Sequence, residues 1–256
     1  MHRGSLDAYL EKQGSSLPLH IRLCFIRDSC AGMLYLSSVG IVHRDLAARN
    51  ILLSEQFDSS SSTGVGGGLI AKVSDFGLSR VLSRDEDYYR SESNVMPIRW
   101  SAPEALLKQK FSTKSDVWSF GVLCWEIFSN GARPYDSVPT KEVIAFLTTE
   151  KKRLSKPNSC PDDVFRIMME TWNEDPELRP DFGTLLDRFS AITELYRPPE
   201  SPQVERAATA LSCPSSSLSS SSLAPSQMNI DSCLFVGSWG TVAAYSIDET
   251  PSPREV

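Results

Sequence analysis

The sequence predicts a mainly helical folded region with a small β element, followed by a tail that does not fold. Three observations support this class: one-sided helical spacing of apolar residues, only a few strand-like runs, and a change of composition near residue 197. Apolar residues make up 41% and charged residues 23%, which is ordinary globular usage and allows a sizeable core. We therefore expect residues 1–197 to fold and residues 198–256, rich in serine and proline, to be disordered.

Three segments have the apolar pattern of buried helices. In the first, apolar residues recur along one helix face before a glycine: Leu23, Ile26, Cys30, Met33 and Leu34. The run 117–128 is apolar nearly all round, so we expect a central, buried helix there. Residues 182–195 have one apolar side and predict a third helix.

The β element is expected around residues 41–75. Two apolar runs, 51–53 and 69–73, flank an insert at 56–68 that consists largely of serine and glycine. We expect a hairpin with a flexible loop, because loop length adds entropy cost only logarithmically.

Charge and hydropathy exclude several classes of partner. The net charge is −6, and the tail accounts for −4 of it through six acidic and two basic residues. Such a chain has no general attraction for nucleic acid or anionic lipid, so we expect no nucleic-acid partner. We expect no membrane segment and no signal peptide, since no run reaches the ~18 apolar residues that span a bilayer. The six cysteines include no Cys-x-x-Cys pair, which favours reduced thiols in the cytosol.

Five motifs carry the candidate chemistry. In chain order they are His-Arg-Asp-Leu-Ala-Ala-Arg-Asn at 43–50, Asp-Phe-Gly at 75–77, Pro-Ile-Arg-Trp-Ser-Ala-Pro-Glu at 97–104, Asp-Val-Trp-Ser-Phe-Gly at 116–121 and Glu-Leu-Arg-Pro at 177–180. Each motif alone is a weak signal, but all five in this order resemble the C-terminal lobe of the protein kinase fold. The resemblance covers about residues 1–197. It implies a kinase-like fold with a large helical lobe, a small β hairpin region and an appended tail.

The resemblance implies the roles of five residues in phosphoryl transfer. Asp45 matches the catalytic acid that accepts or orients the proton of the substrate hydroxyl, and Arg49 matches a cation beside it. Asn50 and Asp75 match the ligands of Mg²⁺, which prefers hard oxygen donors and takes its remaining ligands from ATP. Leu52 matches the apolar floor beneath the adenine ring. The alternative is that Asp45, Asn50 and Asp75 are surface turn and cap residues.

Five other residues match structural positions of the same family. Glu104 and Arg179 match an ion pair that joins the segment after the activation loop to the lobe. Asp116 matches the helix acid that holds the backbone of the catalytic loop. Arg44 matches the arginine that meets an activation-loop phosphate. His43 matches a packed structural residue, for which acid–base catalysis is the alternative.

Two departures from the serine/threonine pattern favour tyrosine as the phosphate acceptor. Serine/threonine kinases usually carry a lysine two residues after the catalytic acid, where this chain has Ala47 and places its cation at Arg49. The segment 97–100 has the tyrosine-kinase form of the peptide-docking loop. Tyr88 and Tyr89, among acidic residues between the second and third motifs, resemble autophosphorylation sites. The alternative is that both are exposed aromatic residues without a regulatory use.

Part of a complete kinase domain is not found in this sequence. The Gly-rich loop, the third-strand lysine and its glutamate partner are missing, and residues 1–6 resemble the hinge between the two lobes. We expect an ATP- and Mg²⁺-dependent tyrosine kinase acting on proteins, cytoplasmic or the cytoplasmic portion of a receptor, of which this chain lacks the N-terminal lobe. The alternatives are an inactive lobe that binds peptides or competes with an intact kinase, and a scaffold role for the tail.

Overall fold

The computed structural model describes residues 2–55, 68–75, 80–81, 89–90 and 97–198. The insert at 56–67, the phenylalanine and glycine of the Asp-Phe-Gly motif, Tyr88 and the tail beyond residue 198 lie outside these ranges. The expectations for those segments therefore stay expectations.

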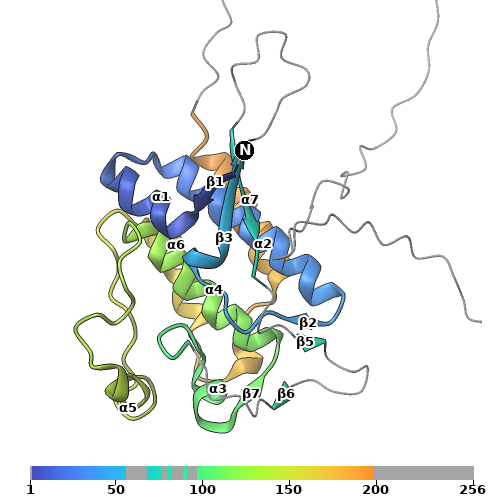
Figure 1. Cartoon of the computed structure of the whole chain (residues 1–256), viewed down its shortest axis with the longest axis vertical. Helices are drawn as coiled ribbons and strands as arrows, with labels where there is room; N and C mark the ends of the chain where they lie inside the picture. Colours follow the sequence, from blue (N-terminus) through green and yellow to red (C-terminus); the bar gives the residue numbers. More distant parts are fainter. Residues whose placement is uncertain (1, 56–67, 76–79, 82–88, 91–96, 199–256) are drawn as a thin grey trace, which may run out of the picture.

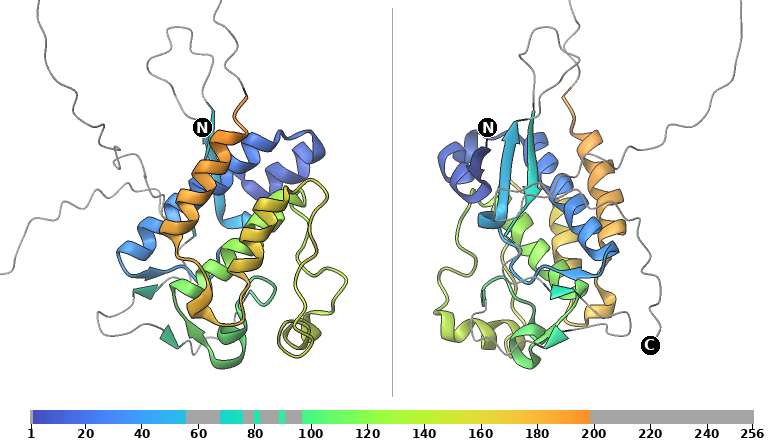
Figure 2. Two further views of the ribbon diagram at one scale, coloured as in Figure 1. Left: turned by 180° about the vertical axis from the view of Figure 1, so that it is seen from behind. Right: turned by 45° about the vertical axis from the view of Figure 1, so that its right-hand side comes forward.

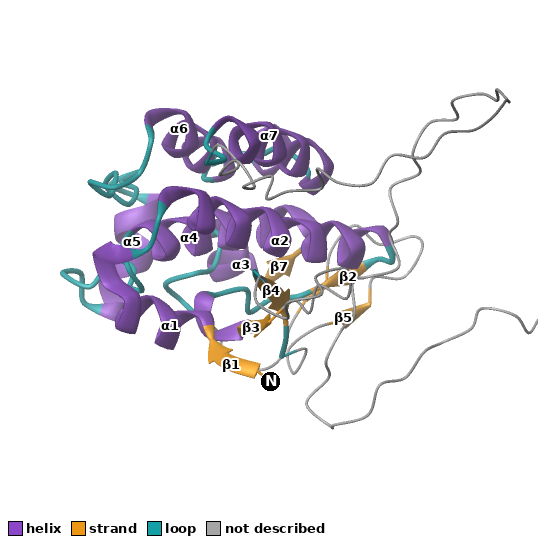
Figure 3. Cartoon of the chain, turned by 90° about the horizontal axis from the view of Figure 1, so that it is seen from above, coloured by secondary structure: helices purple, strands orange, loops and turns teal. Residues whose placement is uncertain are grey.

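The described part of the chain is mainly helical, as predicted. Its α-helices are α1 (Leu6–Gln13), α2 (Leu19–Ser38), α3 (Pro103–Lys108), α4 (Thr113–Phe128), α5 (Val143–Thr148), α6 (Asp162–Thr171) and α7 (Phe182–Leu195). Short 3₁₀ turns are η1 (Gly14–Ser16), η2 (Ala48–Asn50), η3 (Thr140–Glu142) and η4 (Pro176–Leu178). Seen from above, α6 and α7 form an outer layer over α2 and α4, and the strands lie on the opposite side (Figure 3). The mainly helical fold class is thus confirmed.

The strands form three small sheets. They are β1 (His2–Ser5), β2 (Ile41–Val42), β3 (Ile51–Glu55), β4 (Leu69–Val73), β5 (Arg80–Val81), β6 (Tyr89–Arg90) and β7 (Lys110–Phe111). The predicted hairpin is β3–β4, antiparallel, with Ile51 opposite Val73. Strand β1 pairs with the edge of β3 that β4 leaves open, which gives a sheet with the order β1-β3-β4. The pairs β2–β5 and β6–β7 form two separate sheets (Figure 1).

Helix α4 is the centre of the lobe, as its apolar sequence predicts. It begins at Thr113 because Ser112 accepts a hydrogen bond from the Ser115 backbone N–H while the Ser115 hydroxyl accepts one from Ser112 N–H, a complete capping box. Nearly all of its side chains are buried. Helices α2 and α7 run side by side and pack on each other (Figure 2). Helix α4 also contacts β2 and η2, so the core lies beneath the loop that joins them.

Gly121 allows α4 and α6 to approach closely. A Cβ atom at this position would lie 1.9 Å from Thr171 Oγ1 and 2.7 Å from Trp172 Nε1, and both neighbours are fully buried. We expect Gly121→Ala to lower the free energy of unfolding by about 1–3 kcal/mol, the usual range for overpacking a core. Urea denaturation followed by circular dichroism measures this. Gly68→Ala, with no atom within 4 Å of its Cβ, is the control; equal stability of the two variants would contradict the tight packing.

Candidate active site

The loop after β2 is held at its start by a buried carboxylate of α4. Asp116 Oδ2 accepts a hydrogen bond from His43 N–H at 2.7 Å, and Oδ1 accepts one from Arg44 N–H at 3.0 Å. Burial raises the pKa of Asp116, and the hydrogen bonds from the two backbone N–H groups act in the opposite direction. Arg44 adopts a left-handed backbone conformation with φ of 72°, which costs on the order of 1–2 kcal/mol. The two hydrogen bonds hold this strained turn in place.

His43 connects this loop to the end of β4. Its ring is fully buried, with Nε2 3.1 Å from the Ser74 carbonyl oxygen and Nδ1 accepting from Asp45 N–H at 3.3 Å. This pattern requires the proton on Nε2, because Nδ1 acts as the acceptor. Both ring nitrogens are engaged with backbone groups, which supports the structural interpretation of His43 over acid–base catalysis.

The structure brings the three predicted catalytic residues together. Arg49 Nη2 donates a hydrogen bond to Asp45 Oδ1, and Asn50 Nδ2 donates to Asp45 Oδ2 at 2.9 Å and to the Asp45 carbonyl at 2.6 Å. The Asp45 side chain keeps 18% of its surface exposed, so a substrate can reach it. The Arg49 guanidinium also lies 4.4 Å from the centroid of the Trp100 ring, a cation–π geometry. Asp45 is thus oriented from two sides and still accessible.

The predicted metal ligands approach each other through Ser74. Its backbone N–H and its hydroxyl both donate to the Asn50 carbonyl oxygen at 2.9 Å, and Asp75 follows directly. Asp75 is exposed and has a left-handed φ of 60°. Since the amide nitrogen of Asn50 is turned toward Asp45, its amide oxygen is the candidate ligand. Within the described ranges, no cluster of three His, Cys, Asp or Glu side chains could hold a metal alone. One amide and one carboxylate oxygen fit Mg²⁺ that takes its other ligands from a nucleotide.

Leu52 lies on β3, the central strand between the hinge-like β1 and β4. Its neighbours Ile51 and Leu53 are fully buried, whereas Leu52 is partly exposed on the opposite face of β3. Ser5 of β1 pairs with Leu52 from one side and Lys72 of β4 from the other. This placement is compatible with an apolar floor for a flat ring.

The predicted docking loop is fixed by Arg99, whose role sequence patterns did not reveal. Arg99 is buried, and its guanidinium donates to the carbonyl oxygens of residues 134, 135 and 138. Ser119 Oγ on α4 donates to the Trp100 carbonyl oxygen at 2.9 Å. Trp100 is therefore held from the core while its ring contacts Arg49.

Glu104 and Arg179 form the predicted ion pair. Arg179 Nη1 and Nη2 reach Glu104 Oε1 and Oε2 at 2.6 and 2.9 Å, a bidentate arrangement. The Arg179 side chain is completely buried, and it also donates to the carbonyl oxygens of Lys114 and Asn173. The pair ties α3 to the segment that precedes α7.

Only one of the two candidate phosphorylation sites lies in the described residues. Tyr89 belongs to β6, and its backbone pairs opposite Phe111 of β7. The Arg44 guanidinium lies 4.4 Å from the centroid of the Phe111 ring. The register therefore places the backbone of Tyr89 beside the strand residue that Arg44 covers.

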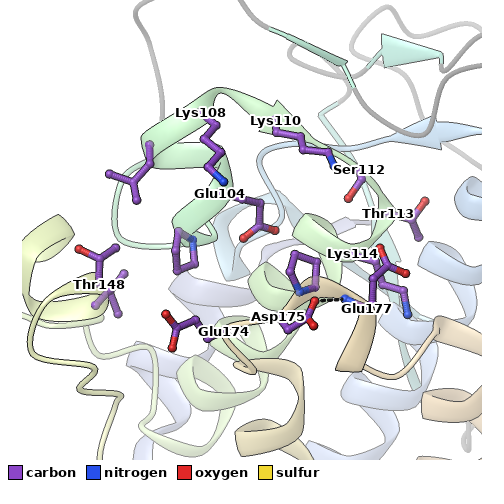
Figure 4. Close-up of a pocket in the computed structure, with 14 residues that line it drawn as sticks. Glu104, Lys108, Lys110, Ser112, Thr113, Lys114, Thr148, Glu174, Asp175 and Glu177 are labelled. Atoms are coloured by element: carbon purple, nitrogen blue, oxygen red, sulfur yellow. Dashed lines mark hydrogen bonds between the residues drawn. The ribbon is translucent and has the colours of Figure 1, made fainter.

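A groove of about 720 Å³ lies elsewhere, between α3, the start of α4 and η4 (Figure 4). Lysines and carboxylates line it, including Lys108, Lys114 and Glu174, together with prolines and leucines. None of the predicted catalytic, nucleotide or metal residues contributes to this groove.

Glu126 is a second site residue, after Arg99, that the sequence patterns did not reveal. It lies on α4 with 5% of its surface exposed, and its Oε2 accepts a hydrogen bond from Ala48 N–H at 2.9 Å. The available signal was a single carboxylate near the end of an otherwise apolar run. A buried acid needs a partner, but the sequence did not indicate which one.

Comparison with known proteins identifies the family. The model for "protein tyrosine and serine/threonine kinase" matches residues 1–189. The chain belongs to the protein tyrosine and serine/threonine kinase family. The match covers every motif described above and agrees with the helical lobe.

The chain is similar to tyrosine kinases of two kinds. It is 42% identical over 193 residues to tyrosine-protein kinase csk-1 of Caenorhabditis elegans, covering 75% of this chain and 33% of that protein. It is 41% identical over 215 residues to human ephrin type-A receptor 8, covering 84% of this chain and 20% of the receptor. Rat ephrin type-A receptor 5 is 41% identical over 202 residues, covering 78% of this chain and 18% of the receptor. The chain thus spans a third or less of these relatives.

Two further expectations can be compared with the described ranges. No helix there combines the length and the apolar composition that crossing a bilayer requires. The cysteines there, Cys24, Cys30, Cys124 and Cys160, are free thiols. Burial raises the pKa of each of them, which makes them poor nucleophiles.

Proposed function

We propose that this chain supplies the catalytic lobe of a protein tyrosine kinase, which transfers the γ-phosphate of ATP to tyrosine hydroxyls in proteins. The observation that carries this proposal is the accessible Asp45 carboxylate, oriented by Arg49 and Asn50. Phosphoryl transfer requires little covalent chemistry from the protein, so an oriented acid beside a fixed cation is the essential arrangement.

Asp45 receives the phenol in this proposal. Its carboxylate accepts the hydrogen bond of the substrate hydroxyl and orients the oxygen toward the γ-phosphate. It takes the proton as the bond from the phenol oxygen to the γ-phosphorus forms, while the bond from that phosphorus to the bridging oxygen breaks and ADP leaves. Arg49 holds Asp45 through one carboxylate oxygen and offsets negative charge near the transferred group. The Arg49–Trp100 stack forms one wall for the ring of a tyrosine, which reaches further from its backbone than serine does.

Asn50 and Asp75 would hold Mg²⁺, and Leu52 with the neighbouring hinge-like strand would support the adenine ring. The bound ion neutralises the negative charge of the phosphate oxygens. The exposed Asp75 at the end of β4 and the Asn50 amide at η2 offer the oxygen ligands from two segments joined through Ser74. We further propose Tyr88 and Tyr89 as phosphorylation sites, with Arg44 as a partner of the added charge.

Substrate specificity can be tested in a two-lobed protein, made by placing the N-terminal kinase lobe of a tyrosine kinase relative ahead of residue 1. We expect phosphorylation of a poly-Glu/Tyr peptide and none of serine peptides, because the Arg49–Trp100 wall fits a phenol. Mass spectrometry of the product measures this. Mainly phosphoserine product would contradict tyrosine specificity. A two-lobed protein in which both lobes are folded but no phosphate is transferred would favour the binding or competitor role.

The 256-residue chain alone is expected to bind Mg·ATP very weakly and to transfer no measurable phosphate. Its residues offer a floor and two metal ligands but no Gly-rich loop or phosphate lysine, so the γ-phosphate is neither covered nor oriented. Calorimetry with Mg·ATP and a phosphotyrosine assay measure these properties. Micromolar binding together with clear tyrosine phosphorylation would show that the missing elements are not required.

A further inference from the structure

The catalytic loop is attached to α4 at both of its ends. Asp116, in the first turn of α4, binds the backbone at residues 43 and 44. Glu126, ten positions further along the helix, binds the Ala48 N–H, just before Arg49 and Asn50. Ten helical residues span about 15 Å, so the two carboxylates act as separate anchors at the two ends of one loop.

Glu126 also lies between two loops. Burial raises its pKa to about 7, while the Ala48 N–H, the Trp100 indole N–H and the positive charge of Arg49 lower it. The geometry connects the two loops through Arg49. Glu126 binds the N–H of Ala48, the residue directly before Arg49, and the Arg49 guanidinium lies over the Trp100 ring of the docking loop.

We propose that Glu126 is a positioning residue, which keeps the Ala48–Asn50 turn and Trp100 in register so that Arg49 and Asp45 meet a tyrosine side chain correctly. This inference rests on the proposed function. Its physical basis is that an apolar residue would suit the surroundings in α4 but would leave the Ala48 N–H buried without an acceptor. When it is ionised, the Glu126 carboxylate also attracts the positive charge of Arg49, whose guanidinium contacts both Asp45 and Trp100.

Glu126 contributes a hydrogen-bond acceptor and a negative charge, and two variants distinguish these contributions. Glu126→Gln keeps an oxygen that can accept from Ala48 N–H but removes the charge opposite Arg49. Glu126→Met keeps the length and the packing of the side chain but removes both the acceptor oxygen and the charge. The control is Glu142→Gln, an exposed glutamate on η3 that loses the same charge.

Hydrogen exchange of the 256-residue chain tests the anchor without any activity. We expect Glu126→Met to speed exchange of the Ala48 amide by about tenfold or more, the effect of one lost net hydrogen bond. Glu126→Gln and Glu142→Gln should leave it nearly unchanged, and core amides of α4 report global stability in each variant. Unchanged Ala48 exchange in Glu126→Met, or equal acceleration throughout α4, would overturn the anchor.

Steady-state kinetics of the two-lobed protein test the positioning. We expect both Glu126 variants to raise KM for the tyrosine peptide or lower kcat while leaving KM for ATP unchanged, with Glu126→Gln the milder of the two. An equal rise in KM for the peptide and for ATP would overturn the proposal, and so would wild-type kinetics in both variants. If the wild-type two-lobed protein transfers no phosphate, the proposed function and its positioning role fail together, whereas the exchange result still decides whether Glu126 anchors Ala48.

Discussion

Replacing Asp45 by asparagine in the two-lobed protein is expected to remove nearly all phosphotransfer, by a factor of about 10²–10⁴, the range for loss of a positioned acid–base group. Asparagine has nearly the same shape and can still contact Asn50, but it cannot take the phenol proton and carries no charge for Arg49. ATP affinity should stay close to wild type, because Asp45 orients the hydroxyl and does not hold the nucleotide. Turnover of a tyrosine peptide and calorimetry with Mg·ATP measure the two effects.

The matched control for this variant is Asp187→Asn. Asp187 is an exposed residue of α7, in the outer helical layer on the opposite side of the lobe from the strands. It undergoes the same chemical change away from the proposed site, so turnover should be unchanged. Near wild-type turnover in Asp45→Asn would contradict the catalytic assignment, and equal losses of turnover and ATP affinity would point to a damaged fold instead.

Removing the carboxylate of Glu104 is expected to give the largest loss of stability. Glu104→Ala leaves the Arg179 guanidinium, which has no exposed side-chain surface, without its charged partner. Breaking a buried pair from one side typically costs about 3–5 kcal/mol, because a buried charge is left uncompensated. Lys114 and Asn173 carbonyls still accept from Arg179 but carry no full charge. Urea denaturation of the 256-residue chain, followed by far-UV circular dichroism, measures the change.

The Glu170–Arg188 pair supplies the control for the ion-pair argument. It is also bidentate, at 2.9 Å for its Nη2–Oε1 contact, but its side chains are 40% and 34% exposed. Glu170→Ala should therefore cost no more than about 1 kcal/mol, the usual range for a solvated pair. If Glu104→Ala lost no more unfolding free energy than Glu170→Ala, burial of the Arg179 guanidinium would not make the loss of its charged partner more costly.

Local patterns in the sequence were sufficient for the main elements and for the candidate residues. Helices α2, α4 and α7 and the hairpin β3–β4 were predicted because apolar periodicity reports which side of a segment is buried. The contact of Asp45 with Arg49 is similarly local, since they are four positions apart in the chain. The motifs also identified the ion pair of Glu104 with Arg179, through resemblance to a family.

The tertiary structure decided the contacts that connect distant segments. Nothing near Ala48 indicates that its N–H meets Glu126, 78 residues away, and nothing near Arg99 indicates the carbonyl groups of residues 134–138. The same holds for β1, whose short sequence has no strong strand pattern and becomes a strand by pairing with β3. Buried polar groups must find partners, but which partner lies within reach depends on how α4 and the loops pack. Residue types and their spacing are enough to show which residues carry charge and which faces are apolar. Which of those charges hold the catalytic loop depends on how the loop packs against α4.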